Sequence, residues 1–151
     1  MVPLIVLVFS FAVLRIVGAF GITVLDNWDL PLRIALFLMF MVTASAHWGR
    51  GRADLMKMVP ESLPAHAALV SVTGILEILG AAGLLFHQTA RLAAICLALM
   101  LVAMFPANAR AARLGLTIMG RKVPSLPIRG AMQLLFIGAL VAVEILSGQA
   151  R

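Results

Sequence analysis

Apolar residues fill five long stretches of the chain, and each stretch is apolar on all sides rather than along one stripe. We place these segments at about residues 2–25, 31–48, 67–86, 90–108 and 128–147. About 20 apolar residues in a helix cross ~30 Å of hydrocarbon, because each residue adds ~1.5 Å. A helix in a water-soluble domain would instead keep a polar face. The pattern therefore predicts an all-α fold: residues 1–151 form a single domain, a polytopic transmembrane bundle of five helices.

The connections between the segments are short and contain most of the prolines. The acidic turn 26–29 predicts that the first two segments form a hairpin. Pro106 lies near the end of the fourth segment, where we expect it to kink or end the helix before Asn108. The loop 50–64 mixes basic, acidic and apolar residues, and an amphipathic surface helix or a solvated loop explains it equally well. A cleaved signal peptide is a weaker reading of the first segment, which lacks a basic start.

Charge is scarce, and its placement predicts an orientation. The chain is 63% hydrophobic and 12% charged, with a net charge of +6. The basic residues flank hydrophobic segments, so we expect no nucleic-acid partner. With five spans, eight Lys and Arg residues fall on the side of the second and fourth loops and three on the other side. Because basic loops stay in the cytoplasm, we predict a bacterial-type inner-membrane protein with a cytoplasmic N-terminus and an external C-terminus.

Two ionisable residues, Arg15 and Glu77, fall inside predicted spans, where a charge costs at least ~2.5 kcal/mol on insertion scales. Counted from the cytoplasmic ends of their segments, they lie at similar depth. We therefore predict an intramembrane ion pair between Arg15 and Glu77. Such a pair either fixes helix register or forms the charged wall of a pocket or proton path, and both readings stay open at this point. Arg15 could also extend to the interface if its segment begins later.

The other polar side chains of the spans fall in the same cytoplasmic half of the bilayer. Thr43 and His47 share one face of the second segment, and Thr73 precedes Glu77 by one turn. We predict a layer of ligand-binding candidates made up of Arg15, Thr43, His47, Thr73, Glu77, Asn108 and Gln133. Two of these residues also have a purely structural interpretation. His47 could be an interfacial histidine next to Trp48, and Asn108 could cap free carbonyls at a helix end.

No catalytic signature is present in the sequence. It has no GxSxG, P-loop or HExxH motif, so we lean against an enzyme and assign no catalytic residue. Cys96 is the single cysteine, which excludes an intramolecular disulfide and a CxxC redox pair. The methionines are expected to fill apolar gaps, and no metal site is predicted.

Four short motifs, in order, resemble the DoxX-like family of small integral membrane proteins. They are Ala46-His47-Trp48, the run 58–64 (MVPESLP), the run 74–80 (GILEILG) and the run 105–108 (FPAN). The resemblance spans roughly residues 31–147. It implies a four-helix core, to which the first segment adds an N-terminal helix. It also implies a link to quinone-coupled oxidation, to membrane oxidoreductase complexes or to chaperoning, while no catalytic residue can be carried over.

Three functional hypotheses follow. The leading one is a bundle that binds a small apolar or amphipathic molecule of the quinone or lipid type, with Arg15, His47 and Glu77 at the polar end of its pocket. Because no haem or cluster ligands are visible, a redox role would need electrons from a partner. The second is an accessory or assembly subunit that contacts other membrane proteins. A transporter is weaker, since the chain shows no inverted repeat, although a homo-oligomer could supply symmetry.

Overall fold

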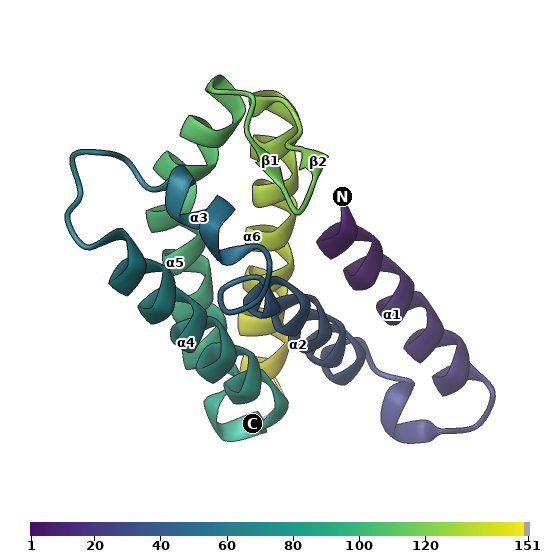
Figure 1. Ribbon diagram of the computed structural model, residues 1–151. Helices are drawn as coiled ribbons and strands as arrows, with labels where there is room; N and C mark the ends of the chain where they lie inside the picture. The colour runs from purple at the N-terminus through teal and green to yellow at the C-terminus, as the bar shows by residue number, and fades with distance from the viewer. Residues whose placement is uncertain (150–151) are drawn as a thin grey trace.

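The computed structural model describes residues 1–149 and consists mainly of helices (Figure 1). The helical elements are α1 (Val2–Ala19), the 3-10 turn η1 (Thr23–Leu25), α2 (Asp29–Ser45), α3 (Arg52–Met58), α4 (His66–Leu85), α5 (His87–Arg113) and α6 (Leu126–Gln149). A two-stranded antiparallel hairpin, β1 (Thr117–Ile118) and β2 (Arg121–Lys122), lies between α5 and α6.

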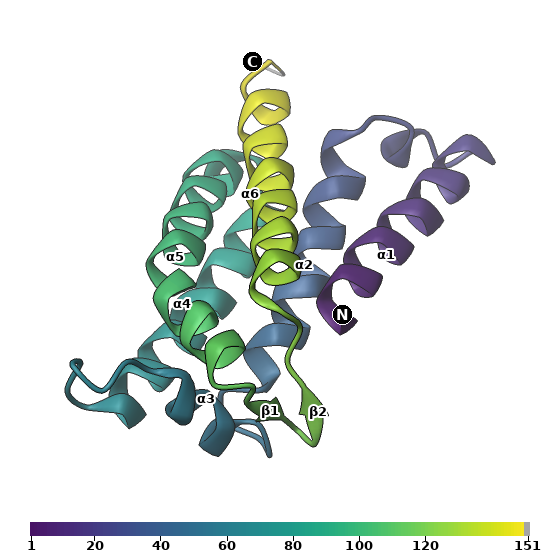
Figure 2. The same ribbon diagram turned by 90° about the horizontal axis from the view of Figure 1, so that it is seen from above.

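Four helices, α2, α4, α5 and α6, pack together, and α1 packs against α2 at the edge of this group (Figures 1 and 2). The long helices alternate in direction along the chain. One end of the bundle therefore carries α3 and the hairpin, and we call it the α3 end. The other end carries η1 and the C-terminal part of α6, and we call it the η1 end (Figure 2).

The helices α1, α4, α5 and α6 are long and apolar enough to cross a membrane. Four of the five expected spans are thus confirmed as candidate membrane-spanning helices by their length and composition. The fifth expected span is α2, which has only 17 residues. It falls short of the ~20 residues that cross hydrocarbon. Even so, α2 contributes much of the core: Ala35, Leu36, Met39 and Phe40 are almost fully buried.

The first helix ends six residues earlier than the apolar pattern predicted. Although residues 20–25 are mostly apolar, α1 stops at Ala19, and Gly21 takes φ +120°, which favours glycine. The chain then folds back onto the helix. A Cβ on Gly18 would lie 2.4 Å from the carbonyl oxygen of Leu25, so only glycine fits this return. Hydropathy alone could not reveal the turn.

The helix α5 runs on past the position where we expected it to end. It passes through Pro106 and continues to Arg113. Its last turns have a core of their own, because the buried Ala111 packs with Met58 of α3 and with Val123, which follows the hairpin. The proline removes one backbone hydrogen bond from the helix. Burial of Ala111 against Met58 and Val123 offsets the free energy of that loss.

The loop between α2 and α4 contains a short helix, α3, so residues 52–58 are helical, whereas the remainder of the segment is a loop. The hairpin, which the apolar pattern did not predict, lies against α3. Met119 and Gly120 form its turn with φ of +51° and +76°, and the backbone N–H of Met119 donates to the Asp54 carboxylate at 3.0 Å. Together, α3 and the hairpin form a cap over the α3 end.

At the η1 end, Arg33 joins two helices. Its guanidinium donates to the carbonyls of Leu84 and Leu85 at 2.5 and 2.8 Å, and to Asp29 at 3.0 Å. These carbonyls end α4 and have no partner within the helix. Asp29 also accepts a hydrogen bond from Ser147 of α6 at 2.7 Å. Arg33, which the sequence marked only as a flanking charge, therefore ties α2 to α4, with α6 attached through Asp29.

Candidate functional site

Three of the predicted site residues, Thr43, His47 and Glu77, meet between α2 and α4. Thr43 and His47 are four residues apart and face the same side, since α2 ends in a tight turn that keeps the helical direction. The Thr43 hydroxyl, which has a single proton, lies 2.9 Å from the carbonyl of Phe40 and 3.2 Å from Oε1 of Glu77, and Nδ1 of His47 lies 3.6 Å from Oε2. Glu77 is 2% exposed and His47 6%. These three residues of the predicted polar layer are therefore in contact, and we call them the Glu77 cluster.

Oε2 of Glu77 is a buried oxygen without a hydrogen bond among residues 1–149. The 3.6 Å to Nδ1 of His47 is slightly longer than a hydrogen bond. A buried carboxyl group without a partner is costly, because its hydration is lost and nothing replaces it. The imidazole of His47 is the group that can meet this oxygen with a proton.

The cluster is closed by close packing rather than open as a pocket. A Cβ on Gly74 would lie 2.7 Å from Cβ of His47 and 2.7 Å from the ring of Trp48. Glycine at this position therefore lets α4 approach the turn after α2 directly. With His47 and Trp48 pressed onto Gly74, the space beside Glu77 is filled by protein.

Arg52, at the start of α3, closes the turn from outside. Its guanidinium donates to the carbonyls of His47 and Ala67, at 2.9 and 3.0 Å, and to the Ser71 hydroxyl at 3.0 Å. It thereby fixes the turn after α2 to the first turns of α4. In the sequence Arg52 counted only as one loop cation among several. Its role depends on where α3 packs, which the apolar pattern does not determine.

Arg15 does not pair with Glu77, so the predicted ion pair is wrong. Because α1 ends early, Arg15 lies near the η1 end instead of at mid-membrane depth. Its Nη1 donates to the carbonyls of Leu25 and Asn27, each at 3.0 Å, and its guanidinium carbon lies 4.9 Å from the centre of the Trp28 ring. The residue caps the turn between α1 and α2 and makes a cation–π contact.

The remaining candidates lie apart from Glu77. The Asn108 side chain accepts a hydrogen bond from Arg129 at 2.5 Å and lies 3.5 Å from the Gln133 side chain, so these residues join α5 to α6. The Thr73 hydroxyl donates within its own helix, 2.9 Å from the carbonyl of Leu69. The predicted single layer is thus divided into the Glu77 cluster, the Asn108 cluster and the isolated Arg15 and Thr73.

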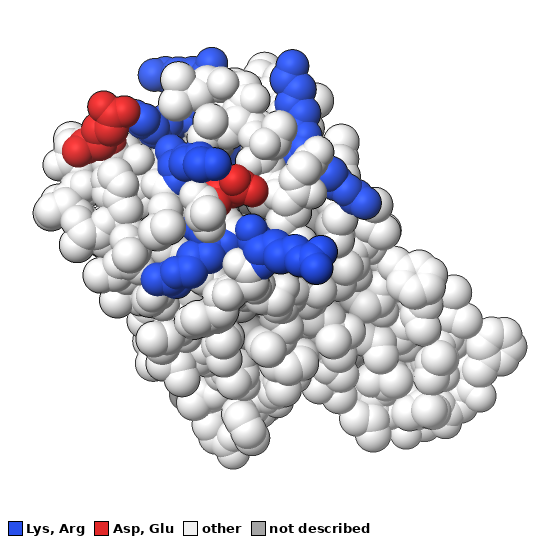
Figure 3. Space-filling model, viewed as in Figure 1, with Lys and Arg blue, Asp and Glu red and all other residues white. Residues whose placement is uncertain are grey.

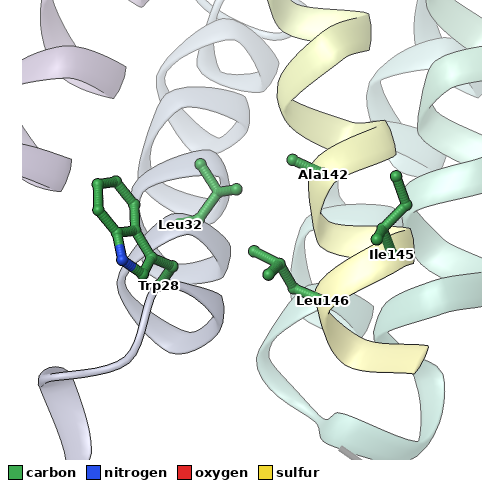
Figure 4. Close-up of a pocket in the computed structure, with 5 residues that line it drawn as sticks. All are labelled: Trp28, Leu32, Ala142, Ile145 and Leu146. Carbon is green, nitrogen blue, oxygen red and sulfur yellow. The ribbon is translucent and has the colours of Figure 1, made fainter. Parts of the chain in front are cut away.

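Two apolar grooves lie outside these clusters. One, of about 320 Å³, lies between α2 and α6 and is lined by Trp28, Leu32, Ala142, Ile145 and Leu146 (Figure 4). We call it the Trp28 groove. A second, of about 590 Å³, lies between α1 and α2 and includes Phe9, Val13, Leu38 and Met41. Neither is lined by a residue of the Glu77 cluster.

Lys and Arg side chains gather over α3 and the hairpin, whereas the surface of α1 in the same view carries none (Figure 3). Two acidic residues are paired within this basic surface. Glu61 accepts from Arg110 at 2.5 Å, which lowers the pKa of its carboxyl group. The N–H of Met119 and then Lys57 lower the pKa of Asp54. The distribution agrees with a charged α3 end outside the hydrocarbon.

Comparison with known proteins gives one match. Residues 36–144 match the family described as Domain of unknown function (DUF8561), and the chain belongs to this family. The matched region runs from within α2 to within α6 and contains the Glu77 cluster, whereas α1 lies outside it. No curated protein and no solved structure matches the chain. The resemblance to the DoxX-like family stays a prediction.

Proposed function

We propose that this protein is an integral inner-membrane protein that binds a lipid-type molecule in the Trp28 groove, with a quinone or a lipid as the ligand class. In this proposal α2 crosses the membrane with the four longer helices, and the α3 end faces the cytoplasm. The observation that carries the proposal is a groove of about 320 Å³ whose lining side chains are Trp28, Leu32, Ala142, Ile145 and Leu146. Such a lining suits an apolar tail, and its one polar side-chain atom is the indole nitrogen of Trp28.

The surroundings of the groove support a ligand with one polar end. Trp28 lies at the η1 end, where an indole is suited to the membrane interface. Arg15 lies over the Trp28 ring, and Asp29 follows it in the chain. An amphipathic molecule with its tail along Leu32 and Ala142 would place its polar end among these groups. The polar end of the proposed site therefore still includes Arg15, as in our first hypothesis. It no longer includes His47 and Glu77, which are buried between α4 and the turn after α2.

Trp28 gives a direct test, because the chain has only two tryptophans. In a Trp48→Phe variant, Trp28 is the only tryptophan. In the matched Trp28→Phe variant, Trp48 is the only tryptophan. A short-chain quinone, which quenches indole fluorescence on contact, is titrated into both in detergent. We expect saturable quenching of Trp28 and only weak, linear quenching of Trp48. Equal linear quenching of both would show simple partitioning into the micelle and would contradict the proposal.

A groove-filling variant adds the specificity control. Phenylalanine at position 142 would project into the groove opposite Leu32, as the positions in Figure 4 show. We expect Ala142→Phe to weaken saturable binding at least ~10-fold, which corresponds to ~1.4 kcal/mol. Gly138→Ala, one turn away on α6 with open space around it, should leave binding unchanged.

An accessory subunit is the second candidate, and α1 is the observation that favours it. This helix packs mainly against α2, and Ile5 and Phe9 are 64% and 69% exposed. Such a helix could contact another membrane protein, or a second copy of this chain, through its outer face. Crosslinking from position 9 in native membranes tests this reading. A reproducible protein adduct supports it, and adducts to lipid alone count against it.

A further inference from the structure

We propose that Glu77 and His47 form a proton-binding site, in which one exchangeable proton is held between Oε2 of the carboxyl group and Nδ1 of the imidazole. The site is separate from the Trp28 groove and does not depend on it. Its ligand is a proton taken up from the medium at the α3 end. The Thr43 hydroxyl lies within hydrogen-bond distance of the other carboxyl oxygen, Oε1, whereas Oε2 has no hydrogen bond among residues 1–149 and lies 3.6 Å from Nδ1 of His47.

The geometry accommodates the proton on either atom. With the proton on Nδ1, the imidazole N–H points to the carboxylate and to the carbonyl of Ala44, which lies 3.3 Å from Nδ1. With the proton on Oε2, the hydroxyl points to the nitrogen. The gap of 3.6 Å needs to close by only ~0.5 Å to become an ordinary hydrogen bond. A movement of this size is within reach of side-chain motion on the turn after α2.

The charges around the pair favour a single proton. Thr43 from α2 and Ser71 and Thr73 from α4 are uncharged, and Arg52 from α3 binds the carbonyl of His47. The charged residues of α5 and α6 with described partners bind elsewhere: Arg91 with Glu144, Arg110 with Glu61, and Arg129 with Asn108. Among residues 1–149, His47 is the only ionisable residue that pairs with the Glu77 carboxylate. One proton leaves the pair neutral overall, whichever atom carries it, and a neutral pair avoids the cost of a lone charge in hydrocarbon.

In this proposal, protons reach the pair of His47 and Glu77 from the α3 end alone. His47 lies in the turn after α2 and is followed by Trp48 and Gly49, both exposed. Toward the η1 end, the next core residues, among them Phe40 and Ala81, are at most 1% exposed. A proton can therefore reach His47 from the α3 end and pass to Glu77, while the core blocks the continuation. The arrangement holds a proton and does not conduct it across the bundle.

A membrane-soluble carbodiimide tests the site, because it adds to a protonated carboxyl group buried in an apolar environment. The carboxyl O–H adds across the C=N bond, and the adduct rearranges to a stable N-acylurea with no leaving group. We expect mass spectrometry of the folded protein to show labelling at Glu77 that is lost as the pH rises, and no labelling in Glu77→Gln. Glu144, which is paired with Arg91, is the internal control and should react at least ~10-fold more slowly, since the guanidinium occupies the carboxyl oxygen that the reagent needs.

The decisive variant is His47→Gln, with His87→Gln as the matched control on the exposed start of α5. Removing the proton partner should move the pH of half-maximal Glu77 labelling by about one unit or more, since a partner within hydrogen-bond range shifts titration by that amount. Both variants must retain the helical content of the parent by circular dichroism, and His47→Asn replaces His47→Gln if the latter fails to fold. Absence of Glu77 labelling in the parent, or an identical pH dependence in the partner variant, would overturn the proposal.

Discussion

Oε2 of Glu77 lies 3.6 Å from Nδ1 of His47, and this contact joins the middle of α4 to the turn that follows α2. Both side chains are buried, and Gly74 allows their backbones to come this close. The polar centre of the bundle is therefore a packed contact between α4 and the turn after α2, while the two apolar grooves lie elsewhere, between α2 and α6 and between α1 and α2.

Two substitutions of Glu77 should separate the effect of side-chain volume on stability from the effect of side-chain charge. Glu77→Gln keeps the volume and can still accept from Thr43, so we expect thermal unfolding in detergent within a few degrees of the parent. Glu77→Lys places a second cation in the region of Arg52 with no anion beside it, and it should cost on the order of 3 kcal/mol. Equal stability of the lysine variant would show that the site is open to water.

Gly74→Ala should be destabilising. The added Cβ would meet His47 and Trp48 at 2.7 Å, and overpacking of this kind costs about 1–3 kcal/mol. Gly130→Ala, in α6 with no atom within 4 Å of its Cβ, is the control and should be neutral or stabilising, because alanine favours a helix. The comparison uses denaturant unfolding in one detergent. A Gly74→Ala variant as stable as the control would contradict the close approach of α4.

Arg33→Gln should weaken the η1 end. It leaves the last carbonyls of α4 and the Asp29 carboxylate without their cation, and Arg33 is only 3% exposed. We expect a loss of about 3 kcal/mol, as for other broken buried pairs. The half-exposed pair of Arg91 with Glu144 serves as the comparison, and Arg91→Gln should cost less than ~1 kcal/mol. Similar losses in both variants would argue against the special role of Arg33.

Acid should loosen the hairpin from α3. The N–H of Met119 and then Lys57 lower the pKa of Asp54 in the folded protein. A lowered folded pKa means that the stabilising contact is fully present above the ordinary value of ~4 and is lost as the pH falls through the lowered one. Amide hydrogen exchange of Met119, corrected for its intrinsic pH dependence, should show this loss. In Asp54→Asn the protection should be weaker at neutral pH and should not change with acid.

Apolar runs predicted the helices of the bundle well, because length and hydropathy alone decide whether a segment can cross hydrocarbon. They failed at ends where tertiary contacts decide. Gly18 and Arg15 turn the chain back before its apolar residues run out, and Ala111 carries α5 past Pro106. The hairpin has two-residue strands, and a turn of Met119 and Gly120 gives too short a signal to detect.

The candidate site was predicted in part. Thr43, His47 and Glu77 come together because the spacing of four residues across the end of α2 and the direction of α4 follow from the sequence. The pairing of Arg15 with Glu77 was wrong because it used depth counted from an assumed helix end. The Trp28 groove was missed, since its residues come from the two ends of the sequence and only packing of α2 with α6 brings them together.

Native mass spectrometry with extraction of small molecules shows directly whether the Trp28 groove holds a ligand. The parent, Ala142→Phe and Glu77→Gln are purified in the same mild detergent. We expect a bound lipid-type molecule in the parent and in Glu77→Gln, and its loss in Ala142→Phe, because the site we propose is the Trp28 groove and not the space beside Glu77. An empty parent, or a bound molecule lost only in Glu77→Gln, would contradict this proposal.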